Sequence, residues 1–464
     1  MNEIEQLKVL LKELSKKDVN LLVESWNEVI KQGYLKHLPK ICQNSYVRIL
    51  KASDYIEYIS NENEPIEDRY AKYFRMLFET NNLEFQKQMP KEVLSEVYTK
   101  LLQESIDKFG FINCENSAQN SLNDRIYLFT NQYLPNSNHA PSVLVEKLYK
   151  ELRKHFKQIF IISSTPYAYP YPDKDFKAFT YSNVDENNLY KLDDNVFYIE
   201  FRGYLTESIY LDFVKYQNFT ANDKFILVGH SSIHFDLIKS NKKFLLPTGM
   251  VTLKLSSASY LLVADDNLIY ENIFNEKYKN IKMSANFTKR GNYIFNPKTS
   301  FETINIAIVG NRLDVELDMD FFEMLVKIKE INSNVKFEFI GGVNKNLIPK
   351  ELSGTVHFIE YISDLSDYFS KNTNFFLNPK RNGGGQSSVM AFKVGVPIIT
   401  LPFGDVYECL EKKYYVNSYE KIPNFINSYI QNEEFKNKID EINKDLTIQS
   451  EEKFNHMIQQ ILNI

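Results

Sequence analysis

Three consecutive glycines, Gly383 to Gly385, form the part of the sequence best suited to bind a phosphate group. Glycine permits backbone conformations and close approaches that a Cβ would prevent. The apolar run Phe375–Leu377 precedes the glycines, and the segment Gln386–Lys393 that follows reads as a helix. The start of a helix favours an anion through its unpaired N–H groups and its positive dipole end. The pattern predicts a diphosphate site, although an ordinary βαβ crossover with a flexible loop has the same elements.

Polar residues surround these glycines. Ser387 and Ser388 stand at the predicted helix start, and Asn382 and Gln386 flank the glycines directly. All four join the glycines in the predicted phosphate-binding set. Lys380 and Arg381 precede the loop, either as additional phosphate ligands or as a pair of exposed cations.

The whole stretch 375–408 resembles the donor-sugar-nucleotide loop of GT-B glycosyltransferases. In that loop a glycine and small hydroxyl residues open a helix, and a G-x-P-hydrophobic segment, here Gly395-Val396-Pro397, closes it. Within this fold the stretch is most similar to the family that includes O-GlcNAc transferase and the bacterial cytoplasmic N-glycosyltransferases. Gln386 and Ser387 stand at the places of that family's paired threonines. The resemblance therefore implies an α/β protein of GT-B architecture, with two Rossmann-like domains facing a cleft. The helical periodicity of the first 110 residues adds an all-α N-terminal domain to this expectation.

Position 390 departs from the family. The family usually has an acidic residue there, which holds the ribose hydroxyls, whereas this chain has Met390. Retaining GT-B enzymes would show two glutamates across this loop, and neither Met390 nor Asn382 supplies one. The resemblance therefore implies an inverting mechanism.

A second loop is expected to reach the donor. The apolar run Ile304–Val309 leads directly into Gly310-Asn311-Arg312. In the resembled family a side chain from this loop reaches the donor diphosphate, and an arginine suits that task because its guanidinium stays charged and can bind two oxygens. We therefore expect Asn311 and Arg312 in the nucleotide-sugar site. The alternative for Arg312 is a surface ion pair.

Two histidines are the catalytic candidates. His139 follows the predicted strand Arg125–Thr130, and the segment 138–142 resembles the family's Asn-His-Pro-Thr loop, whose histidine points into the active site. A neutral imidazole can accept a hydroxyl proton near pH 7. His230 follows the predicted strand Phe225–Val228 and would line the same cleft. The alternative for His139 is a structural role, and the alternatives for His230 are a solvent-facing position or a helix cap.

Composition narrows the class of protein. The chain has 464 residues, with 43% hydrophobic and 25% charged residues, as expected of a folded protein with more than one domain. A net charge of −5 disfavours a nucleic-acid partner. The sequence has no apolar run long enough for a transmembrane segment and no signal peptide, so we expect a cytoplasmic protein. The 3 cysteines have no spacing typical of a disulfide framework or a zinc site.

Periodicity and linker composition divide the chain. We expect a helical N-terminal domain at 1–115, a Rossmann-like acceptor-side domain at 124–290 and a Rossmann-like nucleotide-sugar-binding domain at 300–445. Residues 446–464 are expected to form a C-terminal helix, and the resemblance to GT-B chains implies that this helix packs back on the first Rossmann-like domain. The run Tyr260–Ala264 is predicted as the last strand of the acceptor-side domain, and Asp265 and Asp266 after it are interpreted as turn and cap residues instead of a metal pair.

The resemblance to GT-B glycosyltransferases implies a metal-independent glycosyltransferase without a cofactor. Its donor would be a nucleotide sugar, expected to be UDP-linked, and its acceptor a protein or peptide side chain or a cell-envelope glycan. One alternative is a catalytically silent GT-B module that acts as a scaffold or chaperone for a partner glycosyltransferase, as the Met390 departure would suit. The other is a sugar-nucleotide epimerase of the same architecture. The oligomeric state is not readable from the sequence.

Overall fold

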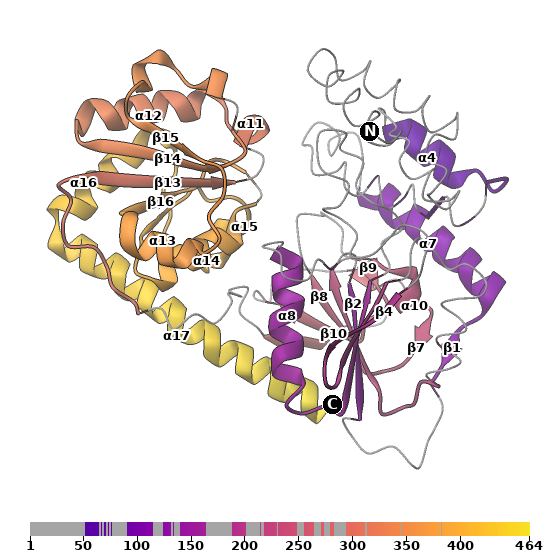
Figure 1. Cartoon of the computed structure of the whole chain (residues 1–464). Coiled ribbons are helices and arrows are strands. Elements are labelled where there is room, and N and C mark those ends of the chain that lie inside the picture. The colour runs from indigo at the N-terminus through magenta and orange to yellow at the C-terminus, as the bar shows by residue number, and fades with distance from the viewer. Residues whose placement is uncertain are drawn as a thin grey trace, which may run out of the picture. The chain divides into compact units, whose positions relative to one another are not determined.

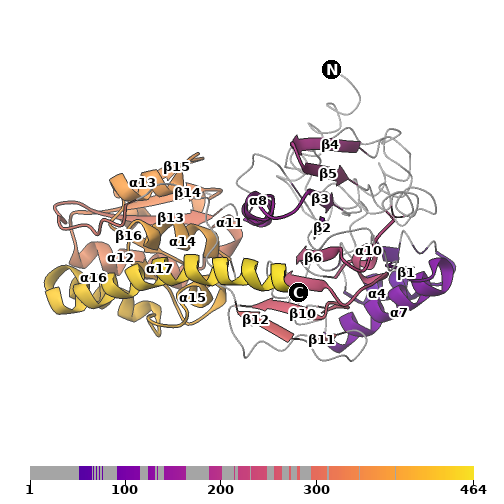
Figure 2. The same ribbon diagram turned by 90° about the horizontal axis from the view of Figure 1, so that it is seen from below.

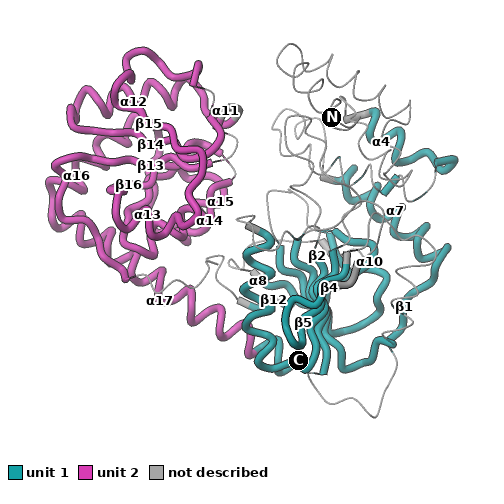
Figure 3. The backbone as a smooth tube through the Cα atoms, in the orientation of Figure 1, with its two compact units in different colours: residues 1–281, 460–464 teal, residues 282–459 magenta. Residues whose placement is uncertain are grey.

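The computed structural model of the chain divides into two compact units (Figure 3). Residues 1–281 and 460–464 form unit 1, and residues 282–459 form unit 2. The structure describes residues 52–64, 66, 69–70, 73, 76, 91–114, 124–130, 133, 140–163, 188–200, 214, 218–229, 231–247, 255–263, 271–272, 279–282, 294–310, 313–343, 345–381 and 383–464. The helices predicted before residue 52 and the Asp265-Asp266 pair lie outside these residues.

Unit 2 is built on a five-stranded sheet in the order β15-β14-β13-β16-β17 (Figure 1). The strands are β13 (Ile304–Gly310), β14 (Val335–Gly341), β15 (Val356–Ile359), β16 (Phe375–Leu377) and β17 (Ile398–Ile399). Every neighbouring pair is parallel. Counted along the chain, the spatial order is 3-2-1-4-5, which is the order of a Rossmann fold. The order reverses between β13 and β16.

The helices of unit 2 cover both faces of this sheet. They are α11 (Leu313–Glu316), α12 (Met319–Ile331), α13 (Leu365–Asn372), α14 (Gly385–Lys393), α15 (Gly404–Cys409), α16 (Ile422–Gln431) and α17 (Glu433–Asn463). Helix α14 contacts both α13 and α15, whereas α12 contacts α16 (Figure 1). Helix α12 begins where the Asp318 carboxylate accepts a hydrogen bond from the Phe321 amide at 2.9 Å, a side-chain N-cap.

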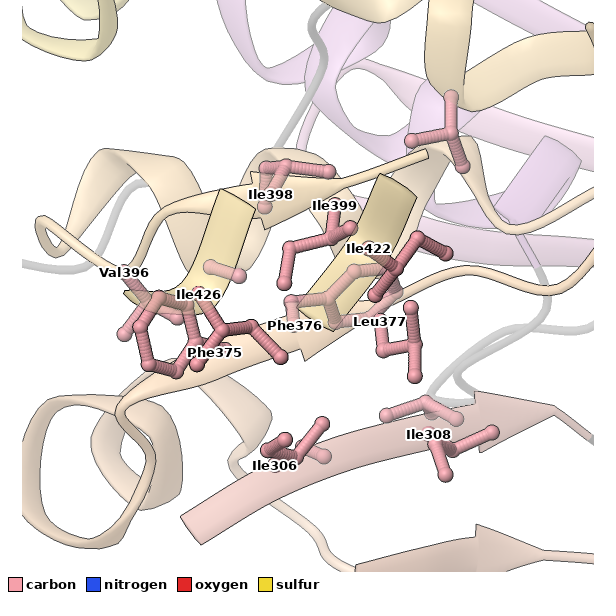
Figure 4. Close-up of a cluster of buried hydrophobic side chains, with 14 of the residues drawn as sticks. Ile306, Ile308, Phe375, Phe376, Leu377, Val396, Ile398, Ile399, Ile422 and Ile426 are labelled. Atoms are coloured by element: carbon pink, nitrogen blue, oxygen red, sulfur yellow. The ribbon is translucent and has the colours of Figure 1, made fainter. Parts of the chain in front are cut away.

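The core of unit 2 explains why its strands read as unbroken apolar runs. Ile306, Phe375 and Ile398 belong to this core (Figure 4). Phe375 packs against Tyr429 of α16, with ring centres 5.3 Å apart, whereas Phe376 packs against Phe369 of α13 on the other face, with ring centres 5.9 Å apart. Parallel strands covered on both faces need apolar residues on both faces. Each such fully buried side chain contributes about 1.5–3 kcal/mol to folding through removal of apolar surface from water.

Unit 1 contains an eight-stranded sheet in the order β12-β10-β8-β6-β2-β3-β5-β4 (Figure 2). The strands are β2 (Arg125–Thr130), β3 (Gln158–Ser163), β4 (Asn188–Asp193), β5 (Val196–Glu200), β6 (Lys224–Gly229), β8 (Lys243–Pro247), β10 (Tyr260–Val263) and β12 (Lys279–Lys282). The pairs from β5 through β10 are parallel, and β4 is antiparallel to β5. The order again reverses between the first strand, β2, and β6, as in a Rossmann fold.

The prediction that Tyr260–Ala264 is the last strand of this domain is wrong. Strand β10 ends at Val263, and β12 then adds a further strand beside it. Strand β12 has the polar sequence KNIK, which gives no apolar run. A strand at the edge of a sheet tolerates such a sequence because one of its sides has no strand neighbour.

Helical segments complete unit 1. They are α4 (Ala52–Ser60), α7 (Lys91–Phe109), α8 (Ala140–Leu152) and α10 (Ile233–Asp236), and the two-residue strands β1 (Ile112–Asn113), β7 (Ile238–Lys239), β9 (Leu255–Ser256) and β11 (Glu271–Asn272) pair as β1-β7 and β9-β11. Tyr55 of α4 and Leu101 of α7 share one hydrophobic core with Phe129 and Leu227 of the large sheet. None of the described helices is long and apolar enough to cross a membrane.

Lys224 fastens the end of α17 within unit 1. Its side chain is fully buried at the start of β6, where Nζ donates a hydrogen bond to the Leu462 carbonyl at 2.8 Å and lies 5.5 Å from the centre of the Phe156 ring. Burial, with a smaller contribution from Lys242, lowers the pKa of Lys224 to about 8. The folded protein therefore binds the proton of this amine more weakly than the unfolded chain does.

We expect this difference to make stability depend on pH. Between pH 8 and the ordinary lysine pKa of 10.5, the unfolded chain holds the extra proton, so the free energy of unfolding rises with pH. In Lys224→Met this contribution is lost. Urea unfolding should show that, between pH 7 and pH 10, the free energy of unfolding of the wild type rises by about 2–3 kcal/mol relative to that of the variant. Parallel pH profiles for the two proteins would contradict the assignment.

Candidate functional site

The two predicted phosphate loops leave the sheet of unit 2 side by side. One follows β13, which ends at Gly310, and the other follows β16, which ends at Leu377. The two strands are parallel neighbours, with Ile306 paired to Phe375. Both loops therefore begin at the carboxyl edge, at the point where the strand order reverses. In open α/β sheets this is where ligands bind.

The glycine loop ends in a left-handed residue. Helix α14 begins at Gly385, and Gly384 before it has φ 101° and ψ −3°. A Cβ at Gly384 would lie 2.7 Å from both Asn378 Oδ1 and Arg381 Nη2, so only glycine fits this position without a shift of its neighbours. The first backbone bond of the helix runs from the Ser388 amide to the Gly384 carbonyl at 3.1 Å. The amides of residues 385–387 precede that bond and are the donors a helix start offers to an anion.

Arg381 is buried beneath this loop, with 7% of its surface exposed. Its Nη2 donates to the Val309 carbonyl at 2.5 Å, its Nη1 to Glu316 Oε2 at 2.8 Å and its Nε to Asn378 Oδ1 at 2.9 Å. The interpretation of Arg381 as an exposed cation is therefore wrong. The guanidinium instead links the end of β13, helix α11 and the glycine loop.

Backbone bonds hold the rest of the loop. The Asn378 amide donates to the Ile399 carbonyl of β17 at 2.9 Å, and the Lys380 amide donates to the Tyr419 hydroxyl at 2.7 Å. Burial raises the pKa of that hydroxyl, so it stays a neutral acceptor. The Lys380 side chain is exposed, as one of the two sequence interpretations has it.

Helix α15 packs against the start of α14. A Cβ at Gly385 would lie 3.0 Å from Asp405 Cβ and 3.0 Å from Cys409 Sγ, so glycine lets the two helices approach. Ser388 is fully buried here, and its hydroxyl donates to the Gly385 carbonyl at 2.8 Å. Burial raises the pKa of the Cys409 thiol, which therefore adds no negative charge beside the helix start.

The remaining predicted donor-site residues divide into two groups. Gly383, Gln386 and Ser387 are partly exposed at the start of α14. The side-chain nitrogen Nε2 of Gln386 is buried and has no hydrogen-bond partner among the described residues. Asn311, Arg312 and Asn382 lie outside the residues that the structure describes.

Unit 1 repeats the arrangement at its own switch point. Strands β2 and β6 are parallel neighbours, with Thr130 paired to Val228, so the segments that follow them leave the sheet at the same edge. In the sequence, His139 precedes helix α8 after β2, and His230 comes directly after β6. Both histidines lie outside the described residues.

A buried polar network anchors the chain just after β6. Asp236 of α10 accepts hydrogen bonds from the Tyr98 hydroxyl at 2.5 Å, from the Ser257 amide at 2.8 Å and from the Ser257 hydroxyl at 2.7 Å. Lys243, also buried, donates to Ser257 and to the Ile238 carbonyl. Burial raises the pKa of Tyr98. This network ties α7 and α10 to Ser257, the residue after β9, and fixes the chain on the C-terminal side of position 230.

The sequence does not identify Glu316 or Asn378 as partners of Arg381. Glu316 is 65 positions away in the chain, and no local sequence pattern indicates a contact over that separation. The glycine at position 310 is an indirect sign that another group approaches the end of β13 closely, because a Cβ there would overlap Arg381 Nη1. Among the described residues, no group of three or more His, Cys, Asp or Glu side chains is placed to hold a metal ion.

No protein-family model and no curated protein matches the sequence. Among solved structures, a mutant form of the Thermobaculum terrenum O-GlcNAc transferase matches with a TM-score of 0.51 at 11% identity, over 100% of this chain and 99% of that one. Sucrose-phosphate synthase from Thermosynechococcus elongatus matches with a TM-score of 0.47 at 10% identity, over 73% of this chain and 97% of that one. The full-length match to the O-GlcNAc transferase, together with the two Rossmann-type sheets, gives this chain the GT-B glycosyltransferase fold.

Proposed function

We propose that the chain is a glycosyltransferase that moves a sugar from a UDP-linked donor to a protein or peptide side chain by inverting, metal-independent displacement. The observation that carries the proposal is the start of α14. It lies after β16, at the switch point of a Rossmann sheet, with the amides of residues 385–387 ahead of the first helical bond. The GT-B fold supplies the class of reaction.

The donor diphosphate would rest on this helix start. Three backbone amides would donate to its oxygens, and the buried Nε2 of Gln386 is a further donor in the same turn. Arg312, one residue before α11, is the proposed side-chain cation. Ser388 is left out of this set because its hydroxyl is buried against the Gly385 carbonyl.

The reaction needs a donor site that stabilises the leaving group. The acceptor oxygen or nitrogen attacks the anomeric carbon from the face opposite the diphosphate, the bond between that carbon and the diphosphate oxygen breaks, and UDP leaves with the bonding electron pair. Negative charge therefore grows on the diphosphate in the transition state. Amides that are already oriented at a helix start stabilise such charge without reorganisation.

His139 is the proposed general base, and His230 is proposed to line the acceptor side. An imidazole that is neutral near pH 7 takes the proton that the acceptor group loses as the new bond forms. Both positions follow strands that border the switch point of unit 1. The proposed location of the protein is the cytoplasm.

We expect His139→Ala to lower kcat by about 100-fold or more, with little change in UDP affinity, because a general base acts on the acceptor in the transition state. Arg312→Ala should weaken UDP binding by about tenfold through loss of one charged contact. The assay is transfer of labelled sugar from a panel of nucleotide sugars to proteins of a cell lysate, read by mass spectrometry. Undiminished transfer by both variants would refute these two roles.

One residue favours a second candidate, a silent GT-B module that serves as a scaffold for a partner glycosyltransferase. Met390, where the resembled family has an acidic residue, packs partly buried against the core of unit 2 and offers no acceptor to a ribose. The two candidates differ in nucleotide binding. A glycosyltransferase should gain thermal stability from UDP, about 2.7 kcal/mol at a concentration one hundred times Kd, whereas a module with a degraded pocket should gain none.

The sequence also left open a sugar-nucleotide epimerase of the same architecture. The distinction lies in the fate of the donor. A transferase releases UDP in step with acceptor glycosylation, whereas an epimerase interconverts the sugar and keeps it linked to UDP. Chromatography of the nucleotide pool with and without acceptor separates the two.

A further inference from the structure

The Arg381 guanidinium lies where both phosphate loops begin. A Cβ at Gly310, the last residue of β13, would overlap Nη1, and a Cβ at Gly384 would lie 2.7 Å from Nη2. The side chain is thus enclosed by the two glycines at the switch point. It also reaches the backbone of β13 through Val309 and the loop through Asn378. One side chain therefore connects the end of β13 to the loop that follows β16.

The positive charge of this arginine has a single described carboxylate partner. Glu316, at the end of α11, accepts from Nη1 at 2.8 Å, and the exposed fractions of the two side chains are 5% for Arg381 and 14% for Glu316. A buried pair of this kind interacts strongly, because few water molecules screen it. The carboxylate also places a negative charge beside the site proposed for an anion.

We propose that Arg381 is a positioning residue of the donor site and that Glu316 lowers the affinity of that site for a nucleoside diphosphate by balancing the Arg381 charge. This inference rests on the proposed function. Arg381 holds the start of α14 at a fixed distance from the end of β13. Glu316 keeps the guanidinium in place without ligand, and its charge repels the diphosphate. The pair therefore sets how tightly the product UDP is held.

The direction in which one variant changes the affinity for UDP distinguishes this role from a purely structural one. In Glu316→Gln the amide oxygen still accepts from Arg381, but the negative charge is gone. We expect UDP to bind about fivefold more tightly at about 0.05 M salt, with the gain shrinking toward zero at about 0.5 M because mobile ions screen the charge. A structural ion pair predicts the opposite, since a weakened pair loosens the loop and weakens UDP binding.

Substitutions of Arg381 test the positioning role. Arg381→Lys keeps the charge but lacks the planar fork that reaches three acceptors, so UDP should bind about tenfold more weakly. Arg381→Met leaves Glu316 buried without its cation and is expected to unfold easily. The double variant Arg381→Met with Glu316→Gln removes that penalty and should regain much of the wild-type melting temperature. It should still bind UDP at least about tenfold more weakly than the wild type.

A matched control comes from unit 1. Arg125 and Asp223 form a buried pair with Nη2 2.7 Å from Oδ2, and the exposed fractions of their side chains are 14% and 1%. Asp223→Asn changes a carboxylate to an amide in the same way as Glu316→Gln. It should lower the melting temperature and leave UDP affinity unchanged.

Isothermal titration of UDP into these folded variants and the wild type tests the inference. Tighter, salt-sensitive binding by Glu316→Gln, with weaker binding by the double variant and no change in Asp223→Asn, is the expected result. If the wild type binds UDP but Glu316→Gln binds equally or more weakly at low salt, or the double variant binds as the wild type does, the inference fails and the proposed function stands. If the wild type binds no UDP, both fail.

Discussion

Gly384→Ala is expected to lower the free energy of unfolding by about 3 kcal/mol and to weaken UDP binding at least about tenfold. Gly384 has φ 101°, where a side chain costs about 1–2 kcal/mol, and its added Cβ would meet Arg381 and Asn378 at 2.7 Å. The loop must therefore shift, and the amides at the start of α14 shift with it. Urea unfolding and UDP titration measure the two effects.

Gly354 provides the control within the same unit. It has φ +80°, also in the left-handed region, but a Cβ there would meet nothing within 4 Å. Gly354→Ala should therefore cost only the backbone strain of about 1 kcal/mol and leave UDP affinity unchanged. If Gly354→Ala and Gly384→Ala had the same effect on UDP affinity, the close approach at Gly384 would have no functional role.

Asp236→Ala is expected to destabilise unit 1 by about 4 kcal/mol, because three short hydrogen bonds lose their acceptor. The Ser257 hydroxyl, which also accepts from buried Lys243, then has no carboxylate to donate to. Circular dichroism with urea gives the change in the free energy of unfolding. UDP affinity should not change in protein that remains folded, because the proposed donor site belongs to unit 2.

Tyr98→Phe measures how much one hydrogen bond of this network contributes to the free energy of unfolding. It removes one donor, the hydroxyl 2.5 Å from Asp236 Oδ2, and leaves the two bonds from Ser257. We expect a loss of about 1–2 kcal/mol. If Asp236→Ala cost no more than Tyr98→Phe, the serine contacts would contribute little and the network would not hold the chain after β6.

Sequence patterns predicted the fold where burial alone decides it. The strands Arg125–Thr130 and Phe375–Leu377 have the bounds predicted for them, because apolar runs mark them locally. Strands β4 and β12 were missed. Their sequences, NLYKLD and KNIK, are partly polar, as edge positions allow, so they carry no apolar run.

The candidate site was predictable in its backbone but not in its side-chain contacts. The sequence predicted a helix from Gln386 after the glycines, and the helix begins one residue earlier, at Gly385. Glycines before it are expected, because a left-handed turn before a helix favours glycine. The burial of Arg381 does not follow from composition, since it depends on Glu316, Val309 and Asn378 meeting at one edge of the sheet. An arginine next to three glycines is ambiguous until those partners are known. The roles of His139, His230 and Arg312 stay predictions.

If the start of α14 holds the diphosphate of the donor, the amide signals of its glycines must respond to UDP. The chain has 15 glycines, so selective ¹⁵N-glycine labelling gives a readable spectrum, with Gly384 and Gly385 assigned through substitution. Titration with UDP should shift the signals of Gly384 and Gly385, and uridine, which lacks phosphates, should not. The Gly354 signal should stay in place in both titrations. Saturable UDP binding that leaves the Gly384 and Gly385 signals unmoved would mean that the diphosphate does not bind at the start of α14.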